Sequence, residues 1–208
     1  MNGLAAQGAL DNSIVIITAD HGESLGDHHL YFNHCWTLFN EIVRVPLIIK
    51  YPGQRTGALV VENVSLVDIF PTILRAAGID LPPFGDGIPL NAISVDAQRL
   101  IYSYFWISNF CVISDAWKLI YYPKNKGGKY INNFFSEYPE RHLQLFNLSD
   151  DPAELHDLSG EEEAVIQWFE NSRIRDQRRR EGAEYRTSGV SALTPAEREV
   201  LRSLGYAH

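Results

Sequence analysis

The pattern of apolar and polar residues in the first half of the chain predicts strands that alternate with helices. The β-branched runs at 14–19 and 44–50 are typical of core strands, the first of them buried on both faces as in a parallel sheet. A helix is expected from 68 to 77, where Asp68 can cap it and Gly78 can stop it. Two shorter pieces are expected, a helical segment at 36–42 and an extended segment at 60–65.

The pattern changes in the second half of the chain, where aromatic and apolar residues alternate with polar ones. This alternation predicts antiparallel strands of a smaller sheet at 99–108, 109–115 and 117–122. A helix at 161–182 and a last helix capped by Thr194 are expected to follow. Five aromatic side chains of the strands are expected to be core residues rather than a carbohydrate platform: Tyr104, Phe105, Trp106, Trp117 and Tyr121.

The first predicted strand ends abruptly in Asp20, His21 and Gly22. In open parallel sheets the ligand crevice lies beyond the carboxyl ends of the strands, and a glycine there lets the backbone turn away. A carboxylate beside an imidazole at that place suggests a metal cation. The plainer alternative is that Asp20 caps a helix and His21 is an ordinary loop histidine. A site is favoured because four of the seven histidines lie close together, at positions 21, 28, 29 and 34.

Two segments that surround these histidines, TADHGESLGDHHLYFNH and TLFNEIVRVPLIIKYPG, resemble the second half of the catalytic domain of a sulfatase. Later segments resemble the same family in the same order: VENVSLVDIFPTILRAAGIDLP, LQLFNLSDDPAELHDLS and LTPAEREVLRSLGY. The chain is therefore similar to the C-terminal portion of an arylsulfatase-like member of the alkaline phosphatase superfamily. The resemblance implies an α/β fold. Residues 1–98 would form part of a sandwich with a mostly parallel sheet and helices, and residues 99–208 a smaller antiparallel-sheet subdomain with C-terminal helices.

The resemblance also implies metal-dependent hydrolysis of a sulfate ester, with roles where the residues match. Asp20 and His21 correspond to metal ligands, and His34 to a catalytic residue that contacts the sulfate oxygens. Two more histidines compete for this substrate-binding role: His28 and His29. Glu23 is expected to start a helix or to lie behind the ligands. Calcium is the metal expected by family, whereas an imidazole ligand favours manganese, iron or zinc.

The nucleophile implied by the resemblance is a formylglycine made in a Cys/Ser-x-Pro-x-Arg motif, and this sequence has no such motif. Neither Cys35 nor Cys111 is followed by the proline and arginine, and no paired aspartates occur near Met1. The opening segment, MNGLAAQGALDNSIVIIT, resembles the interior of a catalytic domain. We therefore expect the missing N-terminal half of the domain to be the partner of this chain. Alone, the chain is expected to fold marginally, to bind metal weakly and not to turn over an aryl sulfate.

Composition narrows the classes of partner. A formal net charge of -8 argues against nucleic acid, which rewards a basic surface. A hydrophobic share of 45% is enough for a globular core, and no stretch approaches the length of a membrane span. Two widely spaced cysteines define neither a zinc site nor a disulfide framework. Localisation stays open, and an exported or periplasmic protein is expected only if a preceding segment carries a signal.

Two other functions stay open at this stage. A relative in the same superfamily that cleaves phosphate esters or phosphonates would use an Asp-His metal pair in the same way. A non-catalytic remnant, or a binding module that keeps the fold, is the alternative from another class. Aryl, carbohydrate and other sulfate esters all remain as substrates, because the loops that would select among them are expected at 24–36 and 124–140.

Overall fold

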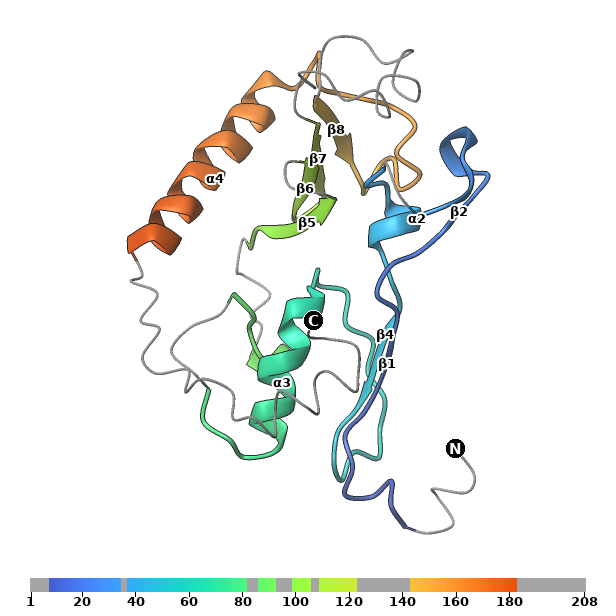
Figure 1. Cartoon of the computed structure of the whole chain (residues 1–208), viewed down its shortest axis with the longest axis vertical. Coiled ribbons are helices and arrows are strands. Elements are labelled where there is room, and N and C mark those ends of the chain that lie inside the picture. The colour runs from blue at the N-terminus through green and yellow to red at the C-terminus, as the bar shows by residue number, and fades with distance from the viewer. Residues whose placement is uncertain are drawn as a thin grey trace, which may run out of the picture. The chain divides into compact units, whose positions relative to one another are not determined.

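The computed structural model of the chain describes residues 8–34, 37–81, 86–92, 99–105, 109–122 and 143–182. The chain divides into two compact units, residues 1–170 and residues 171–208. The described strands, all in the first unit, form two two-stranded sheets and one four-stranded sheet (Figure 1). No helix in the described part of the chain is long and apolar enough to cross a membrane.

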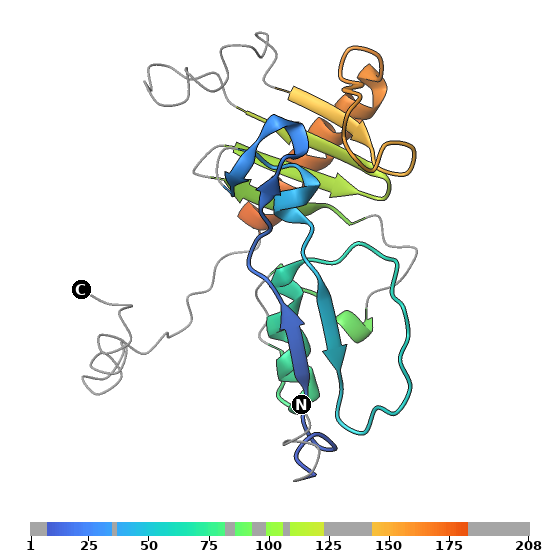
Figure 2. The same ribbon diagram turned by 90° about the vertical axis from the view of Figure 1, so that its right-hand side faces the viewer.

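The two predicted core strands are confirmed as β1 (Val15–Thr18) and β4 (Leu47–Lys50). They pair antiparallel and lie side by side in both ribbon views (Figures 1 and 2). The expected mostly parallel sheet is not found among the described strands, whose pairs are all antiparallel. The expectation that β1 is buried on both faces is wrong. Ile17 and its cross-strand partner Ile48 are 50% and 61% exposed, because no other described element covers the face of the sheet that they share.

The predicted helix at 68–77 is confirmed as α3 (Ile69–Ala76), which directly follows the short 3-10 helix η2 (Leu66–Asp68). Asp68 is the N-cap residue of α3, as predicted, although its side chain makes no capping bond to α3. It instead completes the capping box of η2, whose N-cap is Ser65, by accepting a hydrogen bond from the Ser65 backbone N–H at 2.8 Å. The Asp68 carboxylate is fully buried and also accepts two hydrogen bonds of 2.7 Å from Arg99. Gly78 ends the helix with a φ of 71°, a backbone conformation that glycine adopts at little cost. The segment 60–65 belongs to no strand.

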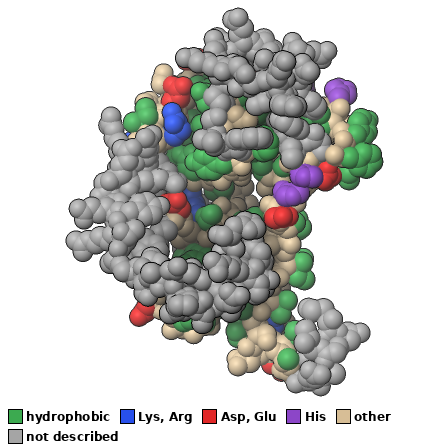
Figure 3. Space-filling view, in the orientation of Figure 1, with side chains coloured by type: hydrophobic (Ala, Val, Ile, Leu, Met, Phe, Trp, Pro, Cys, Tyr) green, Lys and Arg blue, Asp and Glu red, His purple; other side chains and the backbone are tan. Residues whose placement is uncertain are grey.

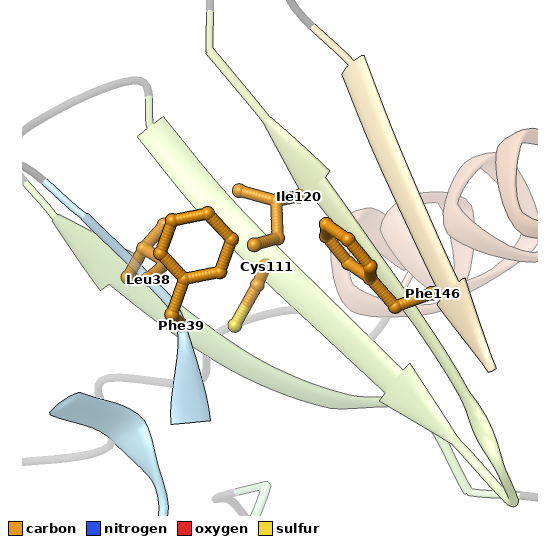
Figure 4. Close-up of a cluster of buried hydrophobic side chains, with 5 residues drawn as sticks. All are labelled: Leu38, Phe39, Cys111, Ile120 and Phe146. Atoms are coloured by element: carbon orange, nitrogen blue, oxygen red, sulfur yellow. The ribbon is translucent and has the colours of Figure 1, made fainter. Parts of the chain in front are cut away.

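The predicted antiparallel strands are confirmed in a four-stranded sheet whose order follows the sequence. Its strands are β5 (Ile101–Phe105), β6 (Asn109–Ser114), β7 (Trp117–Tyr121) and β8 (Leu143–Asn147). Side chains alternate between the two faces of such a sheet, and here each face carries a core. One face packs Cys111, Ile120 and Phe146 against Leu38 and Phe39 (Figure 4).

The other face of this sheet packs Val112, Leu119 and Leu145 against Ile166 and Phe169 of helix α4 (Glu163–Gly182). This helix confirms the prediction at 161–182. Beyond Glu170 it belongs to the second unit, where Arg175 donates a 2.7 Å hydrogen bond to Ser172.

The expected core role of the strand aromatics holds only in part. Phe105 and Trp117 are partly buried and pack against the two cores. Tyr104 is 62% exposed, although its ring lies next to those of Tyr102 and Phe110 on the same face of the sheet, and Tyr121 is also exposed. Several predicted features lie outside the described residues: Trp106, the loop at 124–140 and the helix capped by Thr194.

The predicted short helix at 36–42 exists as α2 (Asn40–Val43), which begins four residues later than expected. Leu38 and Phe39, which lead into α2, are almost fully buried against the four-stranded sheet. The division of the chain at residues 98 and 99 stays a prediction. In the structure, the segment that leads into α2, from residues 1–98, packs on strands from residues 99–208. The candidate site is next to α2, so this packing helps to position it.

Candidate metal and sulfate site

The turn that follows β1 carries the first two predicted site residues, Asp20 and His21. The backbone N–H of His21 donates to the Asp20 carboxylate at 3.0 Å, and this bond, together with the nearby His21 ring, lowers the pKa of Asp20. The Asp20 side chain is 90% exposed and that of His21 is 46% exposed. Residues 21–23 form no helix, so Asp20 does not act as the helix cap of the plainer alternative. An ionised carboxylate therefore faces solvent next to an accessible imidazole.

The hydrogen bonds of His21 define which ring nitrogen is available. Nδ1 lies 2.8 Å from the carbonyl oxygen of Gly22, which can only accept, so Nδ1 carries the proton. In the neutral ring Nε2 is then the nitrogen with a free lone pair. This atom is the one that faces the Asp20 carboxylate, at 3.9 Å. A backbone carbonyl that fixes the ring in this way is typical of histidine metal ligands.

His34 is brought to this turn by a hairpin made of β2 (Ser24–Leu25), the 3-10 helix η1 (Asp27–His29) and β3 (Tyr31–Asn33). The rings of His21 and His34 stack with their centroids 4.7 Å apart. Nδ1 of His34 lies 3.0 Å from the carboxylate of Glu23, which orients the ring. Glu23 starts no helix here and instead holds His34 from behind. Histidine and acidic side chains lie next to each other on the face that Figure 3 shows.

His28 and His29, the other two candidates for a sulfate contact, are placed differently. Nδ1 of His28 lies 2.9 Å from the Glu41 carboxylate, and Nε2 lies 3.1 Å from the carbonyl oxygen of Glu154. The ring also stacks on Phe39 at 3.6 Å between centroids. Both ring nitrogens face acceptors, so the imidazolium form of His28 donates one N–H to Glu41 and the other to the Glu154 carbonyl. Neither N–H is left for a sulfate oxygen. His29 is exposed next to His28.

The pair of His28 and Glu41 predicts a pH dependence of stability. Burial disfavours the charged ring, but the bonds to Glu41 and Glu154 outweigh it and raise the pKa of His28 above its usual 6.5. At Glu41, burial disfavours the charged carboxylate, but the hydrogen bond from His28 outweighs burial and lowers the pKa of Glu41 below its usual 4.5. The His28 contribution is therefore complete below pH 6.5 and lost as pH rises through its raised pKa. The Glu41 contribution is complete above pH 4.5 and lost as pH falls through its lowered pKa.

We expect the free energy of unfolding to fall as pH rises from about 6 to about 8, and we expect much of this fall to disappear in His28→Gln. Urea unfolding of both proteins at the two pH values measures it. An equal fall in both proteins would assign the pH dependence to other groups and contradict the placement of a charged His28.

Gly22 joins the turn of Asp20 and His21 to α2. Its backbone N–H donates to the carbonyl oxygen of Ile42 at 2.8 Å. A Cβ atom at this position would lie 1.9 Å from the carbonyl oxygen of Glu41, which is backbone and cannot rotate away. The glycine is therefore required by close contact between two backbone segments. The turn that carries Asp20 and His21 rests on α2.

Asp20 and His21 lie close enough together to serve as two ligands of one divalent metal ion. Ligands of one small ion lie roughly 3 Å apart at metal distances of about 2.1 Å. The oxygen of Asp20 and Nε2 of His21 are 3.9 Å apart, and the exposed carboxylate can rotate to close the difference. Among the described residues no group of three or more His, Cys, Asp or Glu is arranged to hold a metal. The described residues thus offer one pair of candidate ligands.

Sequence reasoning missed the residues that hold α2 in place: Asn40, Lys118 and Glu154. One signal was present, because Lys118 alternates with Ile120 along β7 and must share the buried face with it. A lysine in the core-facing position of a strand needs a buried acid. The sequence could not show that this acid is Glu154.

Comparison with known proteins identifies the family. The family model described as Sulfatase matches residues 1–79. Arylsulfatase K of Mus musculus is 33% identical over 157 residues, which cover 73% of this chain and 28% of the relative. The fold is that of solved sulfatases: a 2-O GAG sulfatase aligns with a TM-score of 0.65 at 21% identity, over 89% of this chain and 40% of the other. The phosphonate monoester hydrolase of Agrobacterium radiobacter aligns with a TM-score of 0.59 at 19% identity, over 86% and 37%.

The chain belongs to the sulfatase family of sulfuric ester hydrolases and has the alkaline-phosphatase-like α/β fold. Both expectations from the sequence are confirmed. The chain spans about 28% of the length of the curated relative. Members of the family generally use a metal ion, in agreement with the expected class of cofactor.

Proposed function

We propose that this chain provides one side of the active site of a sulfate ester hydrolase, with Asp20 and His21 as ligands of a divalent metal ion and His34 as a contact to the sulfate group. The observation that supports the proposal is the meeting of the three side chains at one exposed place, through the contact of Asp20 with His21 and the stacking of His21 on His34. They come from two segments that only a folded hairpin brings together.

The proposed roles follow from the charges and hydrogen bonds of the three residues. The ionised Asp20 offers oxygen to a cation, and His21 offers Nε2. The Glu23 carboxylate accepts from Nδ1–H of His34 and orients the ring, so Nε2 is the nitrogen left to contact a sulfate oxygen, to which it would donate in the imidazolium form. A bound metal ion would lower the pKa of a nucleophile and offset charge on the sulfuryl group. Calcium is proposed by family, with manganese, iron or zinc as alternatives because His21 is a nitrogen ligand.

The nucleophile is proposed to be a formylglycine that this chain does not supply. Cys111 has no access to substrate, since its side chain is fully buried and burial raises the pKa of its thiol. The surrounding sequence does not match the modification motif at either cysteine. The reaction is therefore proposed for a longer protein that contains this chain.

The substrate class is proposed to be a sulfated carbohydrate, because the described fold aligns with that of a 2-O GAG sulfatase. A second candidate is a phosphonate or phosphate ester, since the phosphonate monoester hydrolase aligns nearly as well. Both esters present anionic oxygens to a metal and a histidine. Comparing turnover of an aryl sulfate with that of an aryl phosphonate, in the longer protein, separates the two.

Removing the proposed carboxylate ligand tests the metal role in this chain directly. We expect Asp20→Asn to weaken Mn²⁺ binding by at least about tenfold, because an amide keeps the shape but loses the charge. Competition with a fluorescent metal indicator measures the affinity. Asp27→Asn is the matched control, since Asp27 is an exposed acid of the same loop that is not proposed as a ligand. Equal weakening by both changes would show that the effect is one of net charge.

A further inference from the structure

A buried ion pair lies at the N-terminal end of α2. Nζ of Lys118 is 2.6 Å from the carboxylate of Glu154, and the two side chains are 0% and 1% exposed. Removing both charges from water is costly, and an ion pair in this position rarely adds net stability compared with apolar residues. The pair has another consequence, because both of its members also bind Asn40, the first residue of α2.

Asn40 is held by two hydrogen bonds. Its backbone N–H donates to the second carboxylate oxygen of Glu154 at 2.5 Å, and its side-chain oxygen accepts from Nζ of Lys118 at 3.1 Å. The N–H of the first residue in a helix has no partner within the helix. The ion pair satisfies this group and fixes where the four-residue helix begins.

The C-terminal half of α2 contacts the turn of the candidate site. Ile42, two residues after Asn40, accepts the hydrogen bond from Gly22, the residue next to His21. Glu41, which lies between Asn40 and Ile42, binds Nδ1 of His28. The other ring nitrogen of His28, Nε2, donates to the backbone carbonyl of Glu154. Both members of this last contact have left-handed backbones, with φ of 50° at His28 and 55° at Glu154, a conformation that is unfavourable for residues with a Cβ atom. The surrounding contacts must therefore hold them in place.

We propose that Lys118 and Glu154 are positioning residues for the candidate metal site, because their buried pair fixes α2 and α2 holds the turn of Asp20 and His21. The inference rests on the proposed function for the meaning of that turn. The mechanical part is independent of it: the contacts run from Lys118 and Glu154 to Asn40, and from Ile42 to Gly22, without a metal ion.

Two variants separate positioning from plain stabilisation. Lys118→Met with Glu154→Leu replaces the pair by apolar side chains of similar volume, so the fold is expected to survive while both bonds to Asn40 are lost. Asn40→Pro removes both hydrogen bonds of Asn40, the one from its N–H and the one to its side-chain oxygen, but keeps the ion pair, and it does so at the first helical position, where proline fits. Phe39 precedes it with φ −69° and ψ 166°, a backbone that proline accepts in the residue before it.

The readout is hydrogen exchange of backbone amides by NMR in the full chain without metal. We expect the protection of the Gly22 amide to fall about tenfold in both variants, while amides of the four-stranded sheet keep theirs. The control is Asp68→Asn with Arg99→Met, which neutralises a buried pair elsewhere in the fold and should leave Gly22 unchanged. Unchanged protection of Gly22 in a folded Asn40→Pro chain overturns the proposal, as does an equal loss in the control.

A second readout keeps this proposal distinct from the proposed function. Mn²⁺ broadens the ring signals of a histidine that binds it, and we expect this broadening at His21 to weaken in both variants. If the unaltered chain shows no broadening at His21 but Gly22 loses protection in the variants, the metal role fails and the positioning role stands. If His21 does broaden, and equally in the unaltered chain and both variants, the turn does not depend on the pair and the positioning role fails.

Discussion

Gly22→Ala is expected to destabilise the chain by about 3 kcal/mol and to abolish metal binding at the Asp20 turn. The added Cβ atom would lie 1.9 Å from the carbonyl oxygen of Glu41 and 2.9 Å from its carbonyl carbon. Both atoms are backbone, so the two segments must separate. Separation breaks the 2.8 Å hydrogen bond from Gly22 to Ile42 and releases the turn from α2.

Urea unfolding and the Mn²⁺ affinity measure the two effects of this change. Gly57→Ala is the matched control, because a Cβ atom at Gly57 meets no atom within 4 Å. We expect the control to change stability by less than about 0.5 kcal/mol. A Gly22→Ala chain as stable as the control would mean that the turn does not rest on α2.

Lys118→Met is expected to lower the free energy of unfolding by about 3–5 kcal/mol. The change leaves the carboxylate of Glu154 buried without its cation, and removes the hydrogen bond to Asn40. Adding Glu154→Leu to Lys118→Met is expected to restore most of this loss, because the double change leaves no unpaired charge in the core. The single change therefore measures the cost of an unpaired charge.

Arg55→Met provides the contrast for Lys118→Met, since the pair of Arg55 with Asp11 is 3.1 Å long but 75% and 64% exposed. Such a pair contributes less than about 1 kcal/mol. If Lys118→Met costs no more than Arg55→Met in urea unfolding, the pair with Glu154 is not buried in solution.

Local patterns were sufficient to predict most of the secondary structure. The runs that became β1 and β4, the alternation of β5 to β7 and the signals around α3 are all properties of consecutive residues. Burial of Ile17 could not be predicted in the same way, because it depends on which elements cover the sheet. The pattern indicates a strand suited to a two-sided core, while the described chain leaves one face of it exposed.

The candidate site was predictable where its residues are neighbours in the sequence. Asp20 and His21 are adjacent, and the hairpin that returns His34 is short. The roles of His28 and His34 could not be separated from spacing, because the difference lies in Glu154, which is 126 residues from His28. The Lys118 to Asn40 contact spans 78 residues and is likewise invisible to local patterns.

The central claim is that Asp20, His21 and His34 form one site for a metal ion and an anion. Titration of the chain with Mn²⁺, followed through the ring signals of its seven histidines by NMR, tests it most directly. His156 is the internal comparison, because it is another exposed histidine beside an acid, at 3.7 Å from the carboxylate of Asp151. We expect His21 and His34 to broaden at the lowest Mn²⁺ concentration, and His156 and His28 only at higher ones. Broadening that begins at His156, or that affects all exposed histidines equally, would contradict the claim.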